Sequence, residues 1–195
     1  MGNKILVTGG QRSGKSSFAE KMALKLSHSE SISGKVSSPV YLATAHIWDA
    51  EFAKRVNNHK SRRGACWTNI EEERYLSNHD FEGRVVLVDC LTLWATNFFF
   101  DLSSGAGEGE ENGNGVSKGE EIVNKTLELL KAEFLQLIKQ DATFIFVTNE
   151  IGMGGVPENF VQRQFTDLLG WFNQFVAEQC DTVYLMTCGI PMKIK

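Results

Sequence analysis

The chain alternates between short apolar runs and longer stretches in which apolar residues recur with a helical spacing. The short runs have the length of buried strands and occupy residues 4–8, 40–44, 85–89, 143–148 and 182–187. Apolar residues three and four positions apart predict helices over residues 14–26, 120–139 and 158–179. Strands that alternate with helices indicate a three-layer α/β domain with a mainly parallel sheet. The tail at residues 190–195 predicts one short antiparallel edge strand.

The remaining stretches are less regular. Residues 91–100 are apolar enough for one or two buried helical turns, and the Ser-rich residues 28–38 predict a surface loop. Asp49 is placed to cap the N-terminus of a further helix. Residues 101–119 contain six glycines among acidic residues and no apolar period, so we expect a flexible insertion there. We expect residues 1–195 to form a single domain.

The most distinctive stretch joins the first strand to the first helix. Residues 9–16 match the phosphate-binding P-loop pattern, G-x-x-x-x-G-K-S/T, at every fixed position. Its glycines let the backbone N–H groups surround an anion, and the helix N-terminus adds partial positive charge. Lys15 is expected to reach the β- and γ-phosphates of a nucleotide, and the Ser16 hydroxyl to ligate Mg²⁺. The alternative is a glycine turn that matches by chance. The motif predicts a P-loop NTPase-like fold and these nucleotide-binding residues: Gly9, Gly10, Gln11, Arg12, Ser13, Gly14, Lys15 and Ser16.

Asp89 ends the nearly all-apolar strand at residues 85–89. An acid in this position holds Mg²⁺ in P-loop enzymes, and ligands of parallel sheets bind beyond the carboxyl ends of the strands. The alternative role of Asp89 is to cap the helix that follows. Polar residues also end the second and fourth strands: Thr44, Thr148, Asn149 and Glu150. Each of these alone is a weak signal, because polar residues commonly end strands.

A cationic segment follows the second strand. Residues 46–63 contain two acids and five cations, which are Lys54, Arg55, Lys60, Arg62 and Arg63. The excess suggests an anionic partner such as a second set of phosphates, although charge runs are usually solvated helix faces. His59 lies among these cations, where a neutral imidazole could act as a nucleophile or proton shuttle. The alternative is a structural histidine. The residues alone therefore indicate a P-loop phosphotransferase without naming its acceptor.

Composition limits the kinds of binding partner and the cellular compartment expected for this protein. The formal net charge of −4 gives no reason to expect nucleic acid or an anionic membrane as partner. Neither a secretory signal pattern nor an apolar stretch long enough to span a bilayer is present. The four cysteines show no C-x-x-C spacing, so we expect reduced thiols in a cytoplasmic protein, without a metal cluster or a disulfide framework.

The chain resembles the bifunctional adenosylcobinamide kinase/adenosylcobinamide-phosphate guanylyltransferase family over almost its whole length. Several long motifs in the right order carry the resemblance. They are Thr8 to Ser16, Tyr41 to Ala45, Asp49 to Glu51, Arg55 to Lys60 with Arg63, Trp67 with Glu71, Asp89 to Trp94 with Asn97, Thr148 to Gly154, Arg163 to Gly170, Asn173-Gln174 and Gly189 to Pro191. The glycine-rich acidic insertion is longer than expected for the family.

The resemblance implies two reactions and their site residues. The first phosphorylates adenosylcobinamide with ATP or GTP, and the second transfers GMP from GTP to that phosphate through a guanylylated histidine. This histidine corresponds to His59, so that His59, Lys15 and Asp89 are the expected catalytic residues. The resemblance further implies nucleotide contacts from Ala43, Thr44, Ala45, Lys60, Ser61, Arg62, Arg63, Glu71 and Asp89. Ser16 and Asp89 are the expected Mg²⁺ ligands. The expected substrate is a corrinoid, and the expected assembly is a homotrimer.

Two other functions remain open at this stage. One is a P-loop kinase that acts on a different small molecule. The other is a nucleotide-dependent switch whose product is a conformational change. The cationic segment with His59 favours the bifunctional enzyme, because a simple kinase needs no second nucleophile.

Overall fold

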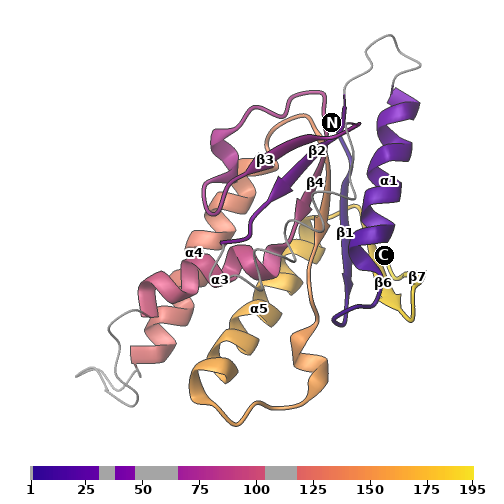
Figure 1. The fold of residues 1–195 in the computed structure, drawn as a ribbon. Coiled ribbons are helices and arrows are strands. Elements are labelled where there is room, and N and C mark those ends of the chain that lie inside the picture. The colour runs from indigo at the N-terminus through magenta and orange to yellow at the C-terminus, as the bar shows by residue number, and fades with distance from the viewer. Residues whose placement is uncertain (1, 31–37, 47–65, 104–117) are drawn as a thin grey trace.

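The computed structural model describes residues 2–30, 38–46, 66–103 and 118–195. Seven strands form one sheet: β1 (Lys4–Gly9), β2 (Val40–Ala43), β3 (Thr68–Glu71), β4 (Val85–Asp89), β5 (Thr143–Val147), β6 (Thr182–Thr187) and β7 (Ile190–Lys193). The described α-helices are α1 (Lys15–Glu30), α3 (Leu91–Ser103), α4 (Lys118–Leu137) and α5 (Phe160–Gln179). Two short 3₁₀ helices, η3 (Leu76–Asn78) and η4 (Ile151–Gly154), complete these elements (Figure 1).

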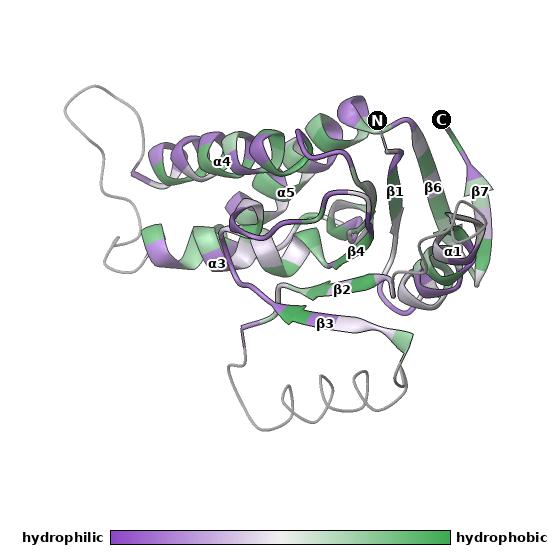
Figure 2. Ribbon diagram, turned by 90° about the horizontal axis from the view of Figure 1, so that it is seen from above, coloured by the Kyte–Doolittle hydropathy of each residue, from purple (hydrophilic) through white to green (hydrophobic). Residues whose placement is uncertain are grey.

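The strand order is β3-β2-β4-β5-β1-β6-β7. Every neighbouring pair is parallel except β6 and β7, which are antiparallel. Figure 2 shows α1 on one side of the sheet and α3, α4 and α5 on the other. The predicted three-layer α/β architecture, with its mainly parallel sheet and antiparallel edge strand, is therefore confirmed.

The central strands are apolar along their whole length because helices cover both faces of the sheet. All five residues of β5 are buried, as are the first four of β4. On the face covered by α4 and α5 the core contains a cluster of aromatic side chains. The ring of Phe134 in α4 lies 4.9 Å from that of Phe146 in β5 and 6.2 Å from that of Phe172 in α5, measured between centroids. These contacts fix α4 and α5 against the sheet.

Several predicted boundaries were wrong. Helix α1 continues to Glu30, into the stretch expected to be a loop. Helix α3 has 13 residues instead of one or two turns, because its buried Leu91, Trp94 and Phe98 continue the helical spacing toward Ser103. Residues 101–103 and 118–119 are therefore helical, contrary to the expected insertion. Residues 104–117, and the helix predicted after Asp49, lie outside the described residues.

Strand β3 was missed. Its sequence, Thr-Asn-Ile-Glu, has three polar residues and shows no apolar run. It forms the edge of the sheet and pairs only with β2, so little of it is buried. An edge strand of this kind is held by its backbone hydrogen bonds, which leave no hydrophobic signal in the sequence.

No helix among the described residues has the length and apolar character needed to cross a membrane.

Replacing the central aromatic residue of α4 should destabilise the fold strongly. We expect Phe134→Ala to lower the free energy of unfolding by ~3–5 kcal/mol, because it leaves a cavity between α4, β5 and α5. Urea denaturation measures this change. Leu129→Ala, on the same helix but with its side chain 42% exposed, is the control and should shift stability by no more than about 1 kcal/mol. Equal effects of the two substitutions would contradict the described packing.

Candidate active site

The carboxyl ends of the parallel strands meet at one edge of the sheet. In the strand register, Ala43 lies opposite both Glu71 of β3 and Asp89 of β4. Asp89 lies opposite Val147 of β5, which in turn lies opposite Val7 of β1. Residues that follow these positions therefore converge on the edge where α/β proteins bind ligands. The predicted site residues of strands β1 to β4 share this edge.

The P-loop makes a tight turn between β1 and α1. Gly9 and Gly14 have φ angles of 147° and 96°, and Arg12 adopts a left-handed φ of 58°. A side chain at Gly9 would place its Cβ only 2.5 Å from the carbonyl oxygen of Met186 in β6. Gly9 is thus required by both the turn and the close approach of a neighbouring strand. Helix α1 begins directly after the turn, at Lys15, so its N-terminus points into the loop.

Neighbouring elements fasten the P-loop through backbone hydrogen bonds. The Glu150 N–H, just after β5, donates to the Gly9 carbonyl at 3.2 Å. The Gly189 N–H, in the turn between β6 and β7, donates to the Ser13 carbonyl at 3.0 Å. A Cβ on Gly14 would lie 3.3 Å from the Gly189 Cα, which shows how closely this turn packs on the loop. The loop conformation is therefore set by the protein before any ligand binds.

Lys15 lies at the centre of the edge. Its side chain is buried, with the residue 7% exposed, and its ammonium donates to the Gly10 carbonyl at 2.6 Å. Burial lowers the pKa of Lys15 below its ordinary value, while interactions with Cys90, Asp89 and Glu150 act in the opposite direction. Because burial raises the pKa of the Cys90 thiol to about 12, the opposing charges near neutral pH are those of Asp89 and Glu150. The structure thus brings Lys15 and Asp89 together, as the sequence predicted.

Asp89 and Ser16 supply oxygen atoms suited to Mg²⁺. One carboxylate oxygen of Asp89 accepts a 2.6 Å hydrogen bond from the Tyr41 hydroxyl, which holds the carboxylate in place. Within the described ranges no group of three or more His, Cys, Asp or Glu side chains could enclose a metal ion. Mg²⁺ typically takes one or two protein ligands and completes its shell with water and phosphate oxygens. A hydroxyl and a carboxylate fit this donor set.

Glu150 is a third charged residue at the site, although its position at a strand end was only a weak signal in the sequence. Its carboxylate oxygen Oε1 accepts a 2.6 Å hydrogen bond from the Thr8 hydroxyl and a 3.3 Å bond from the side-chain amide of Asn173 in α5. Asn173 also accepts a hydrogen bond from the Thr148 hydroxyl at 2.8 Å. Strand β1, the end of β5 and α5 therefore all position this carboxylate. The signal that could have found it is the adjacency of β1 and β5, which a single sequence does not display.

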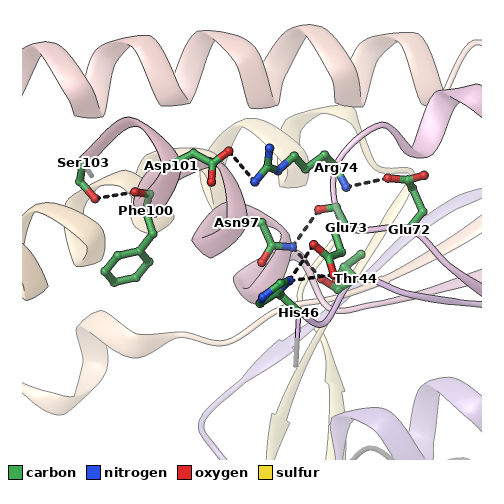
Figure 3. Close-up of polar contacts among 9 residues, drawn as sticks. All are labelled: Thr44, His46, Glu72, Glu73, Arg74, Asn97, Phe100, Asp101 and Ser103. Carbon is green, nitrogen blue, oxygen red and sulfur yellow. Dashed lines mark hydrogen bonds and ion pairs between the residues drawn. The ribbon is translucent and has the colours of Figure 1, made fainter. Parts of the chain in front are cut away.

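The segment after β2 is fixed by a buried polar network. The Thr44 hydroxyl donates to the Cys90 carbonyl at 2.8 Å and accepts from the Cys90 N–H at 3.0 Å. The Asn97 side-chain amide donates to the carbonyl oxygens of Thr44 and Glu73, both at 2.8 Å (Figure 3). Thr44 is fully buried, so its hydroxyl serves to join β2 to β4. Its neighbours in this segment, Ala43 and Ala45, are less buried.

The structure describes His46 but not the second predicted phosphate site. The Nδ1 atom of His46 hydrogen-bonds to both carboxylate oxygens of Glu73, at 2.9 Å each (Figure 3). Glu71 ends β3, in the same row as Asp89. The cationic group and its histidine lie outside the described residues: His59, Lys60, Ser61, Arg62 and Arg63.

Comparison with known proteins decides the family. A family model described as cobinamide kinase / cobinamide phosphate guanyltransferase matches residues 5–194. The chain belongs to this family. It is 36% identical over 195 residues to the bifunctional adenosylcobalamin biosynthesis protein CobU of Salmonella typhimurium strain LT2, covering 98% of this chain and 99% of that protein.

Two further relatives agree with this assignment. The CobU protein of Escherichia coli K12 is 35% identical over 98% of this chain and 99% of its own length. The bifunctional adenosylcobalamin biosynthesis protein CobP of Pseudomonas aeruginosa is 34% identical over 97% of this chain and 96% of its own length. The resemblance seen in the motifs is confirmed, and this member of the cobinamide kinase/guanyltransferase family is an enzyme.

The position of Glu150 beside Lys15 predicts a pH effect. Because the Lys15 ammonium is the group expected to stabilise the transferring phosphate, kcat/KM should fall at high pH, with its alkaline limb below the ordinary lysine value of 10.5. Glu150→Gln removes a negative charge that stabilises the ammonium, so the limb should move to still lower pH. A kcat/KM profile of each protein measures the limb.

The control for this prediction is Glu128→Gln. Glu128 lies on α4, and its side chain is 75% exposed. It should leave the limb where it is in the wild-type protein. A limb that stays in place or moves upward in Glu150→Gln would show that this carboxylate does not act on Lys15.

Proposed function

We propose that the enzyme phosphorylates adenosylcobinamide with ATP or GTP and then transfers GMP from GTP to the new phosphate. The products of the second step are adenosylcobinamide-GDP and pyrophosphate. The observation that carries the first step is the buried ammonium of Lys15, held inside a fastened P-loop beside Asp89 and Glu150. The family assignment supports the choice of acceptor.

Each residue of the P-loop site has a part in the phosphoryl transfer. The inward N–H groups of the loop bind phosphate oxygens, and Lys15 stabilises the charge that develops on the transferring group. Ser16 and Asp89 would hold Mg²⁺, which when bound neutralises phosphate charge. The Ser13 hydroxyl is buried and has no hydrogen-bond partner among the described residues, so a phosphate oxygen would satisfy it.

His59 is proposed as the nucleophile of the second step. An imidazole nitrogen attacks the α-phosphorus of GTP, the bond from that phosphorus to the bridging oxygen breaks, and pyrophosphate leaves. A phosphate oxygen of adenosylcobinamide phosphate then attacks the same phosphorus, and the P–N bond breaks to restore the imidazole. The cations at Lys60, Arg62 and Arg63 follow His59 directly in the sequence and would stabilise the phosphate oxygens.

Other parts of the proposal rest on the motifs that this chain shares with the family. They comprise a homotrimeric assembly in the cytoplasm and nucleotide contacts from the segment Ala43 to Ala45, from Ser61 and from Glu71. The position of Glu71 and Ala43 in one row with Asp89 supports a nucleotide site along this edge.

Labelling with GTP that carries a radioactive α-phosphate tests the histidine. The wild-type protein should acquire covalent GMP through an acid-labile, base-stable bond, as expected for a phosphoramidate. His59→Ala should lose both this label and GMP transfer, yet retain phosphorylation of the corrinoid, because the P-loop is intact. Scintillation counting of the precipitated protein measures the label.

Two variants serve as controls for the labelling. His46→Ala should keep both activities, because His46 precedes the cationic stretch at residues 54–63 in the sequence and its Nδ1 hydrogen-bonds to the Glu73 carboxylate. Lys15→Ala should abolish phosphorylation of the corrinoid. The expected loss of transition-state stabilisation is ~3 kcal/mol or more. Label that maps to His46, or to no histidine, would refute the role of His59. A Lys15→Ala enzyme with the wild-type kinase rate would refute the P-loop assignment.

A further inference from the structure

A groove lies between the segment that follows β5 and helix α5. It has a volume of about 370 Å³ and is lined by Gly152, Gly155, Val156 and Pro157 on one side and by α5 residues between Arg163 and Gln174 on the other. Two apolar residues at this groove are unusually accessible, since Val156 is 86% exposed and Trp171 is 47% exposed. The volume is within the range of small-molecule sites.

Gly170 indicates that the groove is kept open for a ligand. It lies inside the 20-residue helix α5, where glycine is less favourable than alanine. A Cβ added at Gly170 would meet no described heavy atom within 4 Å apart from its chain neighbours and the backbone of its own helix. Packing within the described part of the chain therefore gives no reason for a glycine here. A flat ligand lying against the helix, next to the indole of Trp171, does give one.

The groove is linked to the P-loop through Glu150. Its first wall begins at Gly152, two residues after Glu150, whose N–H and carboxylate are bonded to Gly9 and Thr8 at the start of the P-loop. Its second wall belongs to the helix that carries Asn173, which also bonds to Glu150. In Figure 1 this segment and the start of α5 lie at the same end of the molecule as the turn between β1 and α1. Both walls of the groove are thus connected to the start of the P-loop through Glu150.

The charges of the groove favour a neutral acceptor over a second nucleotide. Its lining residues include one cation, Arg163, and one anion, Asp167, so there is no excess positive charge to attract phosphates. The Arg163 guanidinium also donates to the Pro157 carbonyl at 3.1 Å, which ties the two walls together. Asp167 and Gln174 offer hydrogen-bonding groups at the rim. Apolar surface with such a rim suits a macrocycle that has apolar faces and amide groups around its edge.

We propose that this groove binds the corrin ring of cobinamide and presents its aminopropanol hydroxyl to the P-loop. The proposal rests on the proposed function, which supplies the corrinoid as acceptor. Trp171 lies against the ring, Val156 covers it from the opposite wall, and the open space above Gly170 receives its edge. The ring extends beyond the groove over the exposed surface of the η4 segment.

Equilibrium dialysis of dicyanocobinamide against the full-length protein, without nucleotide, tests this groove directly. Gly170→Leu fills the open space and should raise the Kd for the corrinoid at least about tenfold, although leucine favours the helix. Trp171→Ala should raise it by a similar factor, while Trp171→Phe should retain most of the affinity because a flat ring remains. Both weakened variants should show a raised KM for the corrinoid and an unchanged KM for the nucleotide.

Ala132→Leu is the matched control, since it adds the same side chain to an exposed position of α4. It should bind cobinamide like the wild-type protein. Wild-type affinity in Gly170→Leu and Trp171→Ala, in an enzyme that phosphorylates cobinamide, would overturn the groove alone. A wild-type protein that neither binds nor phosphorylates cobinamide would overturn the proposed function as well. Light scattering of the same variants gives the number of subunits, and a change in that number would identify the groove as a subunit interface and overturn the proposal.

Discussion

The candidate active site depends on a tight glycine turn between β1 and α1 that neighbouring segments hold in place. The polar backbone groups of such a turn cannot all pair within it, so the loop needs partners from outside. The Glu150 N–H holds the Gly9 carbonyl, and the Gly189 N–H holds the Ser13 carbonyl. These bonds come from the segments that follow β5 and β6, the two strands that flank β1. A preorganised loop of this kind can stabilise the transition state without reorganising during the reaction.

The same edge concentrates three charged side chains, Lys15, Asp89 and Glu150. The buried ammonium of Lys15 is disfavoured by its surroundings, and the carboxylates of Asp89 and Glu150 restore part of what burial removes. Each carboxylate is in turn fixed by a hydroxyl, from Tyr41 in one case and Thr8 in the other. Removing one side chain of such a network leaves the polar groups that it contacted without a partner. Substitutions here should therefore affect binding and catalysis together.

The parts of this structure that the sequence predicted are those with a local signal. The P-loop has a fixed spacing of glycines, lysine and serine, and β4 and β5 are continuous apolar runs, so their types and order could be predicted. Strand β3 was missed because an edge strand needs few apolar residues. The extent of α3 was underestimated because helical ends give weak signals.

Features that depend on contacts between distant segments were not predicted. The role of Glu150 becomes visible only when β5 is placed beside β1, and the groove beside it needs the position of α5 as well. Asp89, by contrast, was predicted because it combines a local signal with the general rule that ligands bind at the carboxyl ends of strands. The role of His59 stays a prediction, because that residue lies outside the described part of the chain.

The most direct test of the account is to follow the corrinoid itself. Wild-type protein is incubated with adenosylcobinamide, Mg²⁺ and either ATP or GTP, and the corrinoid products are weighed by mass spectrometry. With ATP alone the mass should increase by one phosphoryl group, and with GTP by a phosphoryl group and then by one GMP. Nucleotide hydrolysis with no change in the mass of the corrinoid would contradict the account and favour a nucleotide-dependent switch.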